Sequence, residues 1–505
     1  MSVFRVDSAI LTGLEVQRIG VEVDVRRGLP NFTVVGLAKD AVRESRDRVI
    51  AAIKNAGYEM PTMKVTVNLT PVTMKKASSH LDLPIAAGIL IASRQIPPPP
   101  AGAVFLGELS LDGTLRPAAG VLALLDGLRD ASAVVVPEGN LEEGRLLKET
   151  ARRVPPIRGL AHLSGLVYPI EKLKSASGRR RRTPEPRDRH ETDFSEIRGQ
   201  HLARRAAEIS AAGGHHLLLV GPPGTGKSML AQRLPTILPP LSTQESLEVT
   251  KIYSVAGLLD ETRRLTVRPF RAPHHTLSAV ALIGGGPTSL PGEISLAHGG
   301  VLFLDEFPEF PRSCLESLRQ PLEDRRVQIS RAAAKVSYPA DFVLICAMNP
   351  CPCGYLNHPT RACRCSAMDI RKYLNRVSGP ILNRIDLHVE LAAESPAVIL
   401  SGASGESSDG ILKRVRAARD RAVARNGGED RVNARLRPSE VRALCPLSDE
   451  CLAILQAALR KMNLSPRSLE KVIKVSRTIS DLAGAADIQP EHILEAVRYR
   501  AMDQA

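Results

Sequence analysis

The sequence of 505 residues contains no tryptophan, and only 3% of its residues are aromatic. The hydrophobic fraction of 43% must therefore consist mainly of valine, leucine, isoleucine and alanine, which suits an α/β protein of two or three domains. Long apolar runs are missing too, since the longest, near residues 83–92, is about half of a membrane span. Residues 1–10 lack the pattern of a secretion signal. We expect a cytoplasmic protein that does not enter a membrane.

Negative charge is in deficit, with a formal net charge of +14 and an isoelectric point of about 9.6. The excess of positive charge favours a polyanionic partner such as nucleic acid, although a solvated basic surface explains it equally well. Eight cysteines are too few for a disulfide scaffold in a chain of this length. Four of them are crowded together, at Cys351, Cys353, Cys363 and Cys365, and this crowding indicates a metal site.

The first part of the chain has the pattern of an α/β domain, over residues 1–171. Alternating apolar residues predict strands around 21–25 and 65–69, with a helix between them that ends near Gly57. The pair Asp112-Gly113 predicts a tight hairpin turn.

Composition changes twice further along the chain. Residues 172–193 are rich in Ser, Gly, Pro and Arg and predict a flexible basic linker, whose arginines could contact phosphates or remain solvated. A core over residues 194–394 follows, and a helical lid is expected over 395–505. The predicted helices of the lid have polar or proline N-terminal residues and lie near 411–425, 439–444, 448–461, 465–482 and 489–499.

A phosphate-binding loop is predicted in the core, between an apolar strand at 215–220 and a helical segment. It reads Gly221-Pro222-Pro223-Gly224-Thr225-Gly226-Lys227-Ser228. Glycines let backbone N–H groups surround phosphates, and the helix N-terminus favours negative charge. Lys227 would reach the β- and γ-phosphates of ATP, and the hydroxyl of Ser228 would bind Mg²⁺.

Acidic and amide side chains follow two further apolar strands, at 301–304 and 342–347. Ligands of open α/β sheets bind where parallel strands end. Asp305 would hold Mg²⁺ there, and Glu306 would orient and deprotonate the attacking water. Asn349 could contact the γ-phosphate or that water, or act merely as a turn former before Pro350.

Long segments of the chain resemble the ComM/YifB family of magnesium-chelatase-like AAA+ ATPases, over nearly its whole length. They are LDLPIA (81–86), RPFRAPHHT (268–276), ISLAHGGVLFLDE (294–306), AMNPCPCGY (347–355) and SGPILNRID (378–386). The resemblance implies a ring of identical subunits, a homo-hexamer, in which Asn349 is sensor 1. It also implies that Arg384 is an arginine finger for the neighbouring subunit's γ-phosphate and that Arg467 is sensor 2 on the lid. Without the family, an ordinary salt bridge would be the simpler role for Arg384.

The first domain is similar to the Lon protease domain, which works with a Ser-Lys dyad. In the matching segments His80 stands at the serine position and Leu122 at the lysine position. We therefore expect no peptidase activity. Another register would place Ser78 or Ser79 at the nucleophile position.

The crowded cysteines form two C-x-C pairs separated by nine residues. Four thiolates can close a tetrahedral Zn²⁺ site, which would stabilise a loop that lacks a core of its own. His358 could replace one ligand, and free or redox-active thiols are the alternative. Because no coordination position is left open, the role of such a metal would be structural.

Two inserts resemble pore elements of AAA+ helicases. The first carries Arg271, His274 and His275, and the second is a predicted hairpin over 326–338 with Arg331 and Lys335 at its tip. In a ring, these side chains would contact threaded DNA in a salt-sensitive and largely sequence-independent manner. A solvated turn for the hairpin tip, and packing or metal binding for the histidines, are the alternatives.

These features predict an ATP- and Mg²⁺-dependent motor that acts on single-stranded and branched DNA. The resemblance implies branch migration during integration of transforming DNA in natural competence. Two alternatives remain: a chelatase-type ATPase that remodels a protein partner, and an ATP-gated protease or its inactive relative. The Lon-like domain and the cysteine insert disfavour the first alternative, and the missing dyad disfavours the second.

Overall fold

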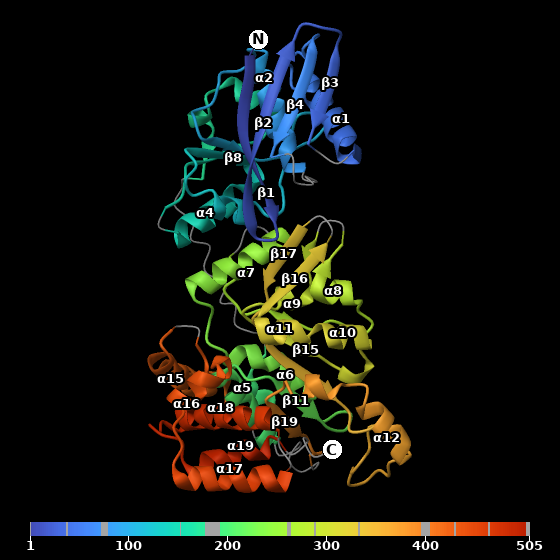
Figure 1. The fold of residues 1–505 in the computed structure, drawn as a ribbon, viewed down its shortest axis with the longest axis vertical. Coiled ribbons are helices and arrows are strands. Elements are labelled where there is room, and N and C mark those ends of the chain that lie inside the picture. The colour runs from blue at the N-terminus through green and yellow to red at the C-terminus, as the bar shows by residue number, and fades with distance from the viewer. Residues whose placement is uncertain are drawn as a thin grey trace.

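The computed structural model describes residues 2–36, 39–71, 79–151, 153–176, 192–259, 264–286, 289–331, 334–394, 405–428, 431–462 and 465–500. An N-terminal sheet, a central α/β core and a C-terminal group of helices follow one another along the long axis of the molecule (Figure 1). Among the described helices, none has both the length and the apolar character needed to cross a membrane.

The N-terminal sheet is mixed and eight-stranded, with the order β10-β9-β8-β5-β1-β2-β4-β3. Its strands are β1 (Ser2–Thr12), β2 (Glu15–Arg26), β3 (Asn31–Val35), β4 (Lys64–Thr70), β5 (Ala103–Phe105), β8 (Ala133–Pro137), β9 (Ile157–Leu160) and β10 (Lys174–Ser175). The predicted strands correspond to β2 and β4, which pair antiparallel. The predicted hairpin is confirmed as β6 (Glu108–Leu109) and β7 (Leu115–Arg116).

The helices of the N-terminal part pack on this sheet and form the hydrophobic core together with it. They are α1 (Lys39–Asn55), α2 (Asp82–Ala92), α3 (Val121–Gly127) and α4 (Leu141–Thr150). The longest apolar run of the sequence lies in α2, whose residues 82–91 are all buried. A helix that is apolar on every face needs burial on every face, and α2 packs on β1 and β2.

The predicted linker over 172–193 starts too early. Most of it, residues 177–191, lies outside the described residues. Lys174–Ser175, however, form β10, which pairs antiparallel with β9 and extends the first sheet. An edge strand of two residues leaves no periodic pattern in a sequence, so composition alone placed the boundary before it.

The core sheet is parallel and five-stranded, with the order β12-β15-β18-β11-β19. Its strands are β11 (Leu217–Val220), β12 (Phe270–Arg271), β15 (Val301–Leu304), β18 (Val343–Met348) and β19 (Leu387–Glu390). Every residue of β11, β15 and β18 is buried, as expected for parallel strands with helices on both faces.

Helices and two-stranded ribbons surround this sheet. The helices are α5 (His201–Gly213), α6 (Lys227–Ile237), α7 (Thr243–Val255), α8 (Ala279–Ile283), α9 (Glu293–Leu296), α10 (Arg312–Ser317), α11 (Arg319–Asp324), α12 (Ala367–Leu374) and α13 (Gly379–Leu382). The ribbons are β13 (Gly284–Gly285) with β14 (Leu290–Pro291), and β16 (Arg326–Arg331) with β17 (Ala334–Pro339).

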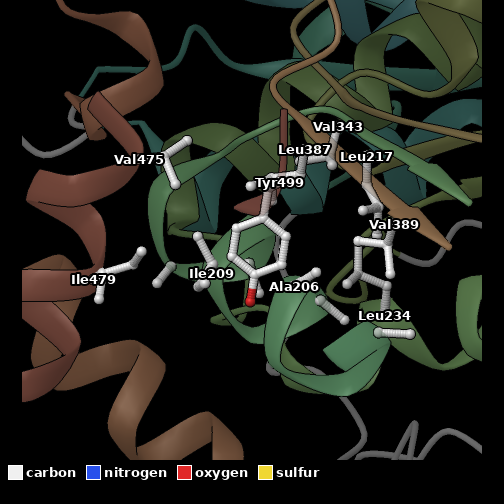
Figure 2. Packing of buried hydrophobic residues seen from close by; sticks show 14 of the residues in the cluster. Ala206, Ile209, Leu217, Leu234, Val343, Leu387, Val389, Val475, Ile479 and Tyr499 are labelled. Carbon is white, nitrogen blue, oxygen red and sulfur yellow. The ribbon is translucent and has the colours of Figure 1, made fainter. Parts of the chain in front are cut away.

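The C-terminal helices lie within a few residues of the predicted ones. They are α15 (Ser408–Asn426), α16 (Pro438–Leu444), α17 (Asp449–Met462), α18 (Pro466–Ala483) and α19 (Pro490–Arg498). Val475 and Ile479 of α18 pack with Tyr499, Ile209 of α5 and Leu387 of β19 in one apolar cluster (Figure 2). The lid helices therefore share their core with one face of the sheet.

The N-terminal sheet contacts the core at two places. The turn between β1 and β2 lies against β17, where Gly13 is so close that a Cβ atom would stand 2.8 Å from Val336 Cγ1. At the second place, the buried carboxylate of Glu143 accepts a hydrogen bond of 2.8 Å from Ser254 Oγ of α7. Lys251 of α7 forms an ion pair of 2.8 Å with Asp126.

Candidate nucleotide site

The phosphate-binding loop connects β11 to α6, as predicted. Gly224 and Gly226 have φ angles of +79° and +86°, in the left-handed region that favours glycine. A Cβ atom built at either position would meet nothing within 4 Å, so the space in front of the loop is open. Gly221 is different, because a Cβ there would stand 2.6 Å from the carbonyl oxygen of Leu391. The loop is thus packed on one side and open to a ligand on the other.

Lys227 is buried at the first turn of α6. Its Nζ donates to the carbonyl oxygens of Gly221 and Pro222 and to Oδ1 of Asn349, over 2.6, 2.9 and 3.2 Å. Burial lowers the pKa of this amine, while the nearby carboxylate of Asp305 opposes the change. A desolvated ammonium group in this position attracts an anion strongly.

Ser228 and Asp305 are brought together as the sequence predicts. Ser228 Oγ donates to Asp305 Oδ2 over 2.7 Å, and Asp305 Oδ1 accepts from the backbone N–H of Glu306 over 2.9 Å. A hydroxyl and a carboxylate beside a phosphate loop are the ligands that Mg²⁺ takes in such sites. The chemistry of these donors therefore fits ATP with Mg²⁺.

Strand register explains the grouping. β18 lies between β15 and β11, with Leu304 opposite Cys346 and Val220 opposite Met348. Because all three strands are parallel, their carboxyl ends place Asp305, Asn349 and the loop at one edge of the sheet. The N–H of Gly221 also bonds the carbonyl of Met348 over 3.2 Å.

Glu306 lies beside His275, a residue of one of the two predicted pore inserts. Its backbone is left-handed, with φ of 51°, and its side chain is 58% exposed. Nδ1 of His275 stands 2.9 Å from Glu306 Oε2, and the ring of His274 lies 4.1 Å from that of His275. His275, which belongs to a predicted pore insert, therefore lies against Glu306 in this chain.

Arg271, another residue of this predicted pore insert, pairs with a carboxylate of α9. On β12, its guanidinium makes two bonds to the carboxylate of Glu293, of 2.6 and 2.7 Å. This pairing raises the pKa of Arg271. His274 remains exposed.

The predicted hairpin is confirmed as β16 and β17, which pair from Arg326 opposite Pro339 to Arg331 opposite Ala334. Lys335 is exposed near its tip. Residues 332–333 and the side chain of Arg331 lie outside the described part of the chain.

Arg384 and Arg467 lie at the other edge of the sheet. Arg384 precedes β19, next to Asp386, whose backbone N–H bonds the carbonyl of His216 just before β11. The amino ends of parallel strands are opposite the phosphate loop, so the structure does not bring Arg384 to Lys227 of the same chain. Arg467 stands with Arg384, because both donate to Glu323.

Family models for magnesium chelatase subunit ChlI match three parts of the chain: the main model at residues 193–399, a second at 21–140 and the C-terminal model at 405–500. The protein YifB of Salmonella typhimurium is 41% identical over 509 residues, covering 100% of this chain and 98% of that protein. Competence protein ComM of Haemophilus influenzae is 40% identical over 506 residues, covering 99% and 98%. The chain belongs to the ComM/YifB family of magnesium-chelatase-like AAA+ proteins.

A weaker similarity connects this family member with a DNA-processing protein. The Holliday junction branch migration complex subunit RuvB of Leifsonia xyli is 28% identical over 246 residues, covering 47% of this chain and 60% of RuvB.

The four crowded cysteines of this ComM/YifB-family chain converge in space. Their sulfur atoms all lie within 4.8 Å of one another. The Sγ atoms of Cys351, Cys353 and Cys363 are 3.4 to 3.7 Å apart, and the N–H of Cys353 points to Cys365 Sγ at 3.4 Å. Backbone hydrogen bonds from Arg364 and Tyr355 lower the pKa of Cys353 to about 6. His358 does not belong to this group, since its Nδ1 accepts from the N–H groups of Thr360 and Arg361.

The positions that match the protease dyad carry His80 and Leu122. Leu122 is buried on α3, and its N–H bonds Glu143 over 2.7 Å. Burial lowers the pKa of His80. Ser78 and the side chain of Ser79 lie outside the described residues. A leucine supplies no amine, so the expectation of no peptidase activity stays a prediction based on residue type.

Contacts between distant segments are what the sequence could not reveal. The pairing of His275 with Glu306 depends on β12 lying beside β15. In the sequence Glu323 is an ordinary exposed helix residue, and the structure shows that Arg384 and Arg467 both bond to it.

Proposed function

We propose that this chain is an ATP-driven motor that remodels DNA as a ring of identical subunits, a homo-hexamer, and promotes branch migration during recombination. This proposal rests mainly on the placement of two sets of residues. One edge of the core sheet carries Lys227, Ser228, Asp305 and Asn349, and the opposite edge carries Arg384. A subunit built this way offers a nucleotide site on one side and an arginine for a neighbour's nucleotide on the other.

The chain's own residues have distinct roles in hydrolysis. Lys227 and the backbone of the loop would hold the phosphates, while Asn349 would orient the γ-phosphate or the water. Ser228 and Asp305 would hold Mg²⁺, which compensates the charge that develops on the phosphates. Glu306 would accept the proton of the attacking water once its carboxylate turns from His275. Arg384 and Arg467 would act from the adjacent subunit.

DNA as the partner is supported by three independent features. The net charge is +14, Lys335 is exposed near the tip of the hairpin, and two similar proteins are named for competence and for Holliday junction branch migration. Contacts of this kind are made to phosphates and weaken as salt is added.

Zinc is the metal we infer for the cysteine cluster. Four thiolates with no carboxylate or water position favour Zn²⁺ over the harder cations, which take oxygen ligands.

DNA-dependent ATP hydrolysis tests the proposal. We expect single-stranded or forked DNA to stimulate hydrolysis, and the protein to unwind forked and branched duplexes with ATP. Lys227→Ala should abolish nucleotide binding, whereas Glu306→Gln should bind ATP and lose turnover. An ATPase that ignores DNA would contradict the proposal and favour a chelatase-type motor acting on a protein.

A further inference from the structure

The segment between β18 and α12, residues 349–366, has no helix or strand of its own. Most of its side chains are exposed or half-buried, and Cys351 and Gly354 are its buried residues among those with described side chains. A segment with so little apolar burial needs another source of stability. The four converging sulfurs are the obvious one.

The spacing of these sulfurs matches a metal. With Zn–S bonds of about 2.3 Å, tetrahedral geometry separates the sulfurs by about 3.8 Å, and three of the four atoms are already 3.4 to 3.7 Å apart. Cys351 and Cys353 belong to the start of the segment, directly after Asn349. Cys363 and Cys365 belong to its end, directly before Ser366, which caps α12. One metal would therefore tie the two ends together.

The start of this segment touches the phosphate-binding loop. Gly354 has φ of +81°, and a Cβ atom there would stand 2.7 Å from Cδ of Pro223 and 3.7 Å from Cγ of Asn349. The side-chain oxygen of Asn349 in turn accepts a hydrogen bond from Nζ of Lys227. Gly354 therefore packs against Pro223 of the loop, while Asn349, at the start of the segment, bonds Lys227.

The end of the segment returns to the same place through α12. Tyr373 of α12 is buried, and burial raises its pKa to about 12, opposed by a hydrogen bond to the backbone of Asn349. Cys351 and Cys353 lie just before the first of these attachments, Gly354, and Cys363 and Cys365 lie between it and Tyr373. We propose that one Zn²⁺ bound by Cys351, Cys353, Cys363 and Cys365 braces the nucleotide site, by holding Gly354 against Pro223 and Asn349 beside Lys227. Loss of the zinc then weakens nucleotide binding at a loop that contains none of the four cysteines.

This inference rests on the proposed binding of ATP at residues 221–228, so the experiment measures metal and nucleotide separately. The full chain is purified without chelator, its zinc content is measured by mass spectrometry, and the affinity for a fluorescent ATP analogue is measured by titration. We expect about one zinc per chain. The double variant Cys363→Ser/Cys365→Ser should lose the zinc and bind the analogue about tenfold more weakly.

Two further variants separate bracing from folding. Gly354→Ala keeps all four thiols, yet it adds a Cβ against Pro223 at a backbone angle that alanine disfavours. It should keep the zinc and still bind nucleotide about tenfold more weakly, which tests the brace even if the double variant fails to fold. The control is Cys451→Ser, a buried cysteine of α17 outside the cluster, whose bond to the carbonyl of Ile488 a hydroxyl can keep. It should change neither quantity.

The results discriminate sharply. Zinc-free wild-type protein, or full nucleotide affinity in both Gly354→Ala and the double variant, overturns the brace. Zinc-loaded wild-type protein that binds no nucleotide overturns the proposed function instead.

Discussion

Arg384 and Arg467 donate to the same carboxylate oxygen, Oε1 of Glu323, over 2.5 and 2.8 Å. One arginine precedes β19 in the core and the other begins α18 in the lid, so a single acceptor on α11 aligns guanidinium groups from two parts of the chain. Both stand at the sheet edge opposite Lys227. We therefore expect the two arginines to act together on a neighbouring subunit's nucleotide.

Removing the side chain of Arg384 should separate nucleotide binding from hydrolysis. Arg384→Ala should bind ATP like the wild type and lose hydrolysis by about 10³-fold, since an arginine supplied in trans stabilises transition-state charge. Steady-state ATPase rates and nucleotide titrations check this. Arg442→Ala, an exposed arginine of the lid, is the control. A mixture of Arg384→Ala with Lys227→Ala subunits should recover activity, and no recovery at any ratio would argue against action across the interface.

His275 should restrain Glu306. A carboxylate engaged by the imidazole at 2.9 Å is less available to accept a proton from water. His275→Ala should therefore raise ATP hydrolysis measured without DNA by several-fold. His274→Ala is the matched control, because that ring contacts Thr276 rather than Glu306. A loss of turnover in His275→Ala would instead make the histidine a positive contributor to catalysis.

The β16–β17 hairpin should contribute to DNA binding and not to ATP hydrolysis measured without DNA. Lys335→Ala should leave DNA-free hydrolysis unchanged and weaken DNA binding, with a shallower dependence on salt because one phosphate contact per subunit is lost. Binding titrations over a salt series measure this, with Lys413→Ala on the exposed face of α15 as the control. Equal salt slopes for both variants would remove Lys335 from the interface.

Asp386 and Lys471 should be strongly coupled. Their ion pair of 2.7 Å joins the start of β19 to α18. Although burial opposes its charge, Lys471 and His215 hold the pKa of Asp386 well below its usual range. Asp386→Asn should lower the free energy of unfolding by about 3 kcal/mol, because it leaves the lysine buried and unpaired. Adding Lys471→Met to Asp386→Asn should lower the free energy of unfolding much less than Lys471→Met does on its own. If urea unfolding shows that the losses of the two single variants add up in the double variant, the coupling is contradicted.

Acid should destabilise the core through His216. Burial lowers its pKa from 6.5 to about 4, with Asp386 opposing and Lys471 adding to the shift. Nδ1 of His216 accepts the N–H of Leu344 over 3.1 Å, which a protonated ring cannot do. Below pH 6.5 the unfolded chain takes up this proton and the folded chain does not, so stability falls as pH falls towards 4. The slope attributable to this group is about 1.4 kcal/mol per pH unit.

The variant His216→Asn isolates that slope. Its amide oxygen can accept from Leu344 but does not titrate, so the difference in unfolding free energy between wild type and variant should change between pH 6.5 and 4 and stay constant above pH 7.5. A constant difference over the whole range would mean that His216 takes up its proton at the same pH in the folded and unfolded chains.

Local signals in the sequence were sufficient for much of the site. The glycines, Lys227 and Ser228 lie within one loop, and Asp305 and Asn349 each follow a buried strand, so strand direction alone predicts that they meet. The lid helices were predicted from their N-terminal residues and spacing for the same reason: each is specified by its own segment.

Contacts made by short or irregular elements were beyond such signals. β12 has only two residues, and its pairing with β15 carries His275 to Glu306 and Arg271 to Glu293. Part of the segment predicted to line a pore thereby lies against Glu306. In the same way β10 escaped notice, and the cysteine spacing predicted that the four thiols lie close together but not that Gly354 packs against Pro223.

Gly13 occupies a position with no room for any side chain, against Val336 and the carbonyl of Ser337 at the middle of β17. A tilt of the N-terminal sheet must therefore either displace the hairpin or open this contact. The N-terminal domain would in this way fix the position of the β16–β17 tip, so that a movement of one domain is transmitted mechanically to the other.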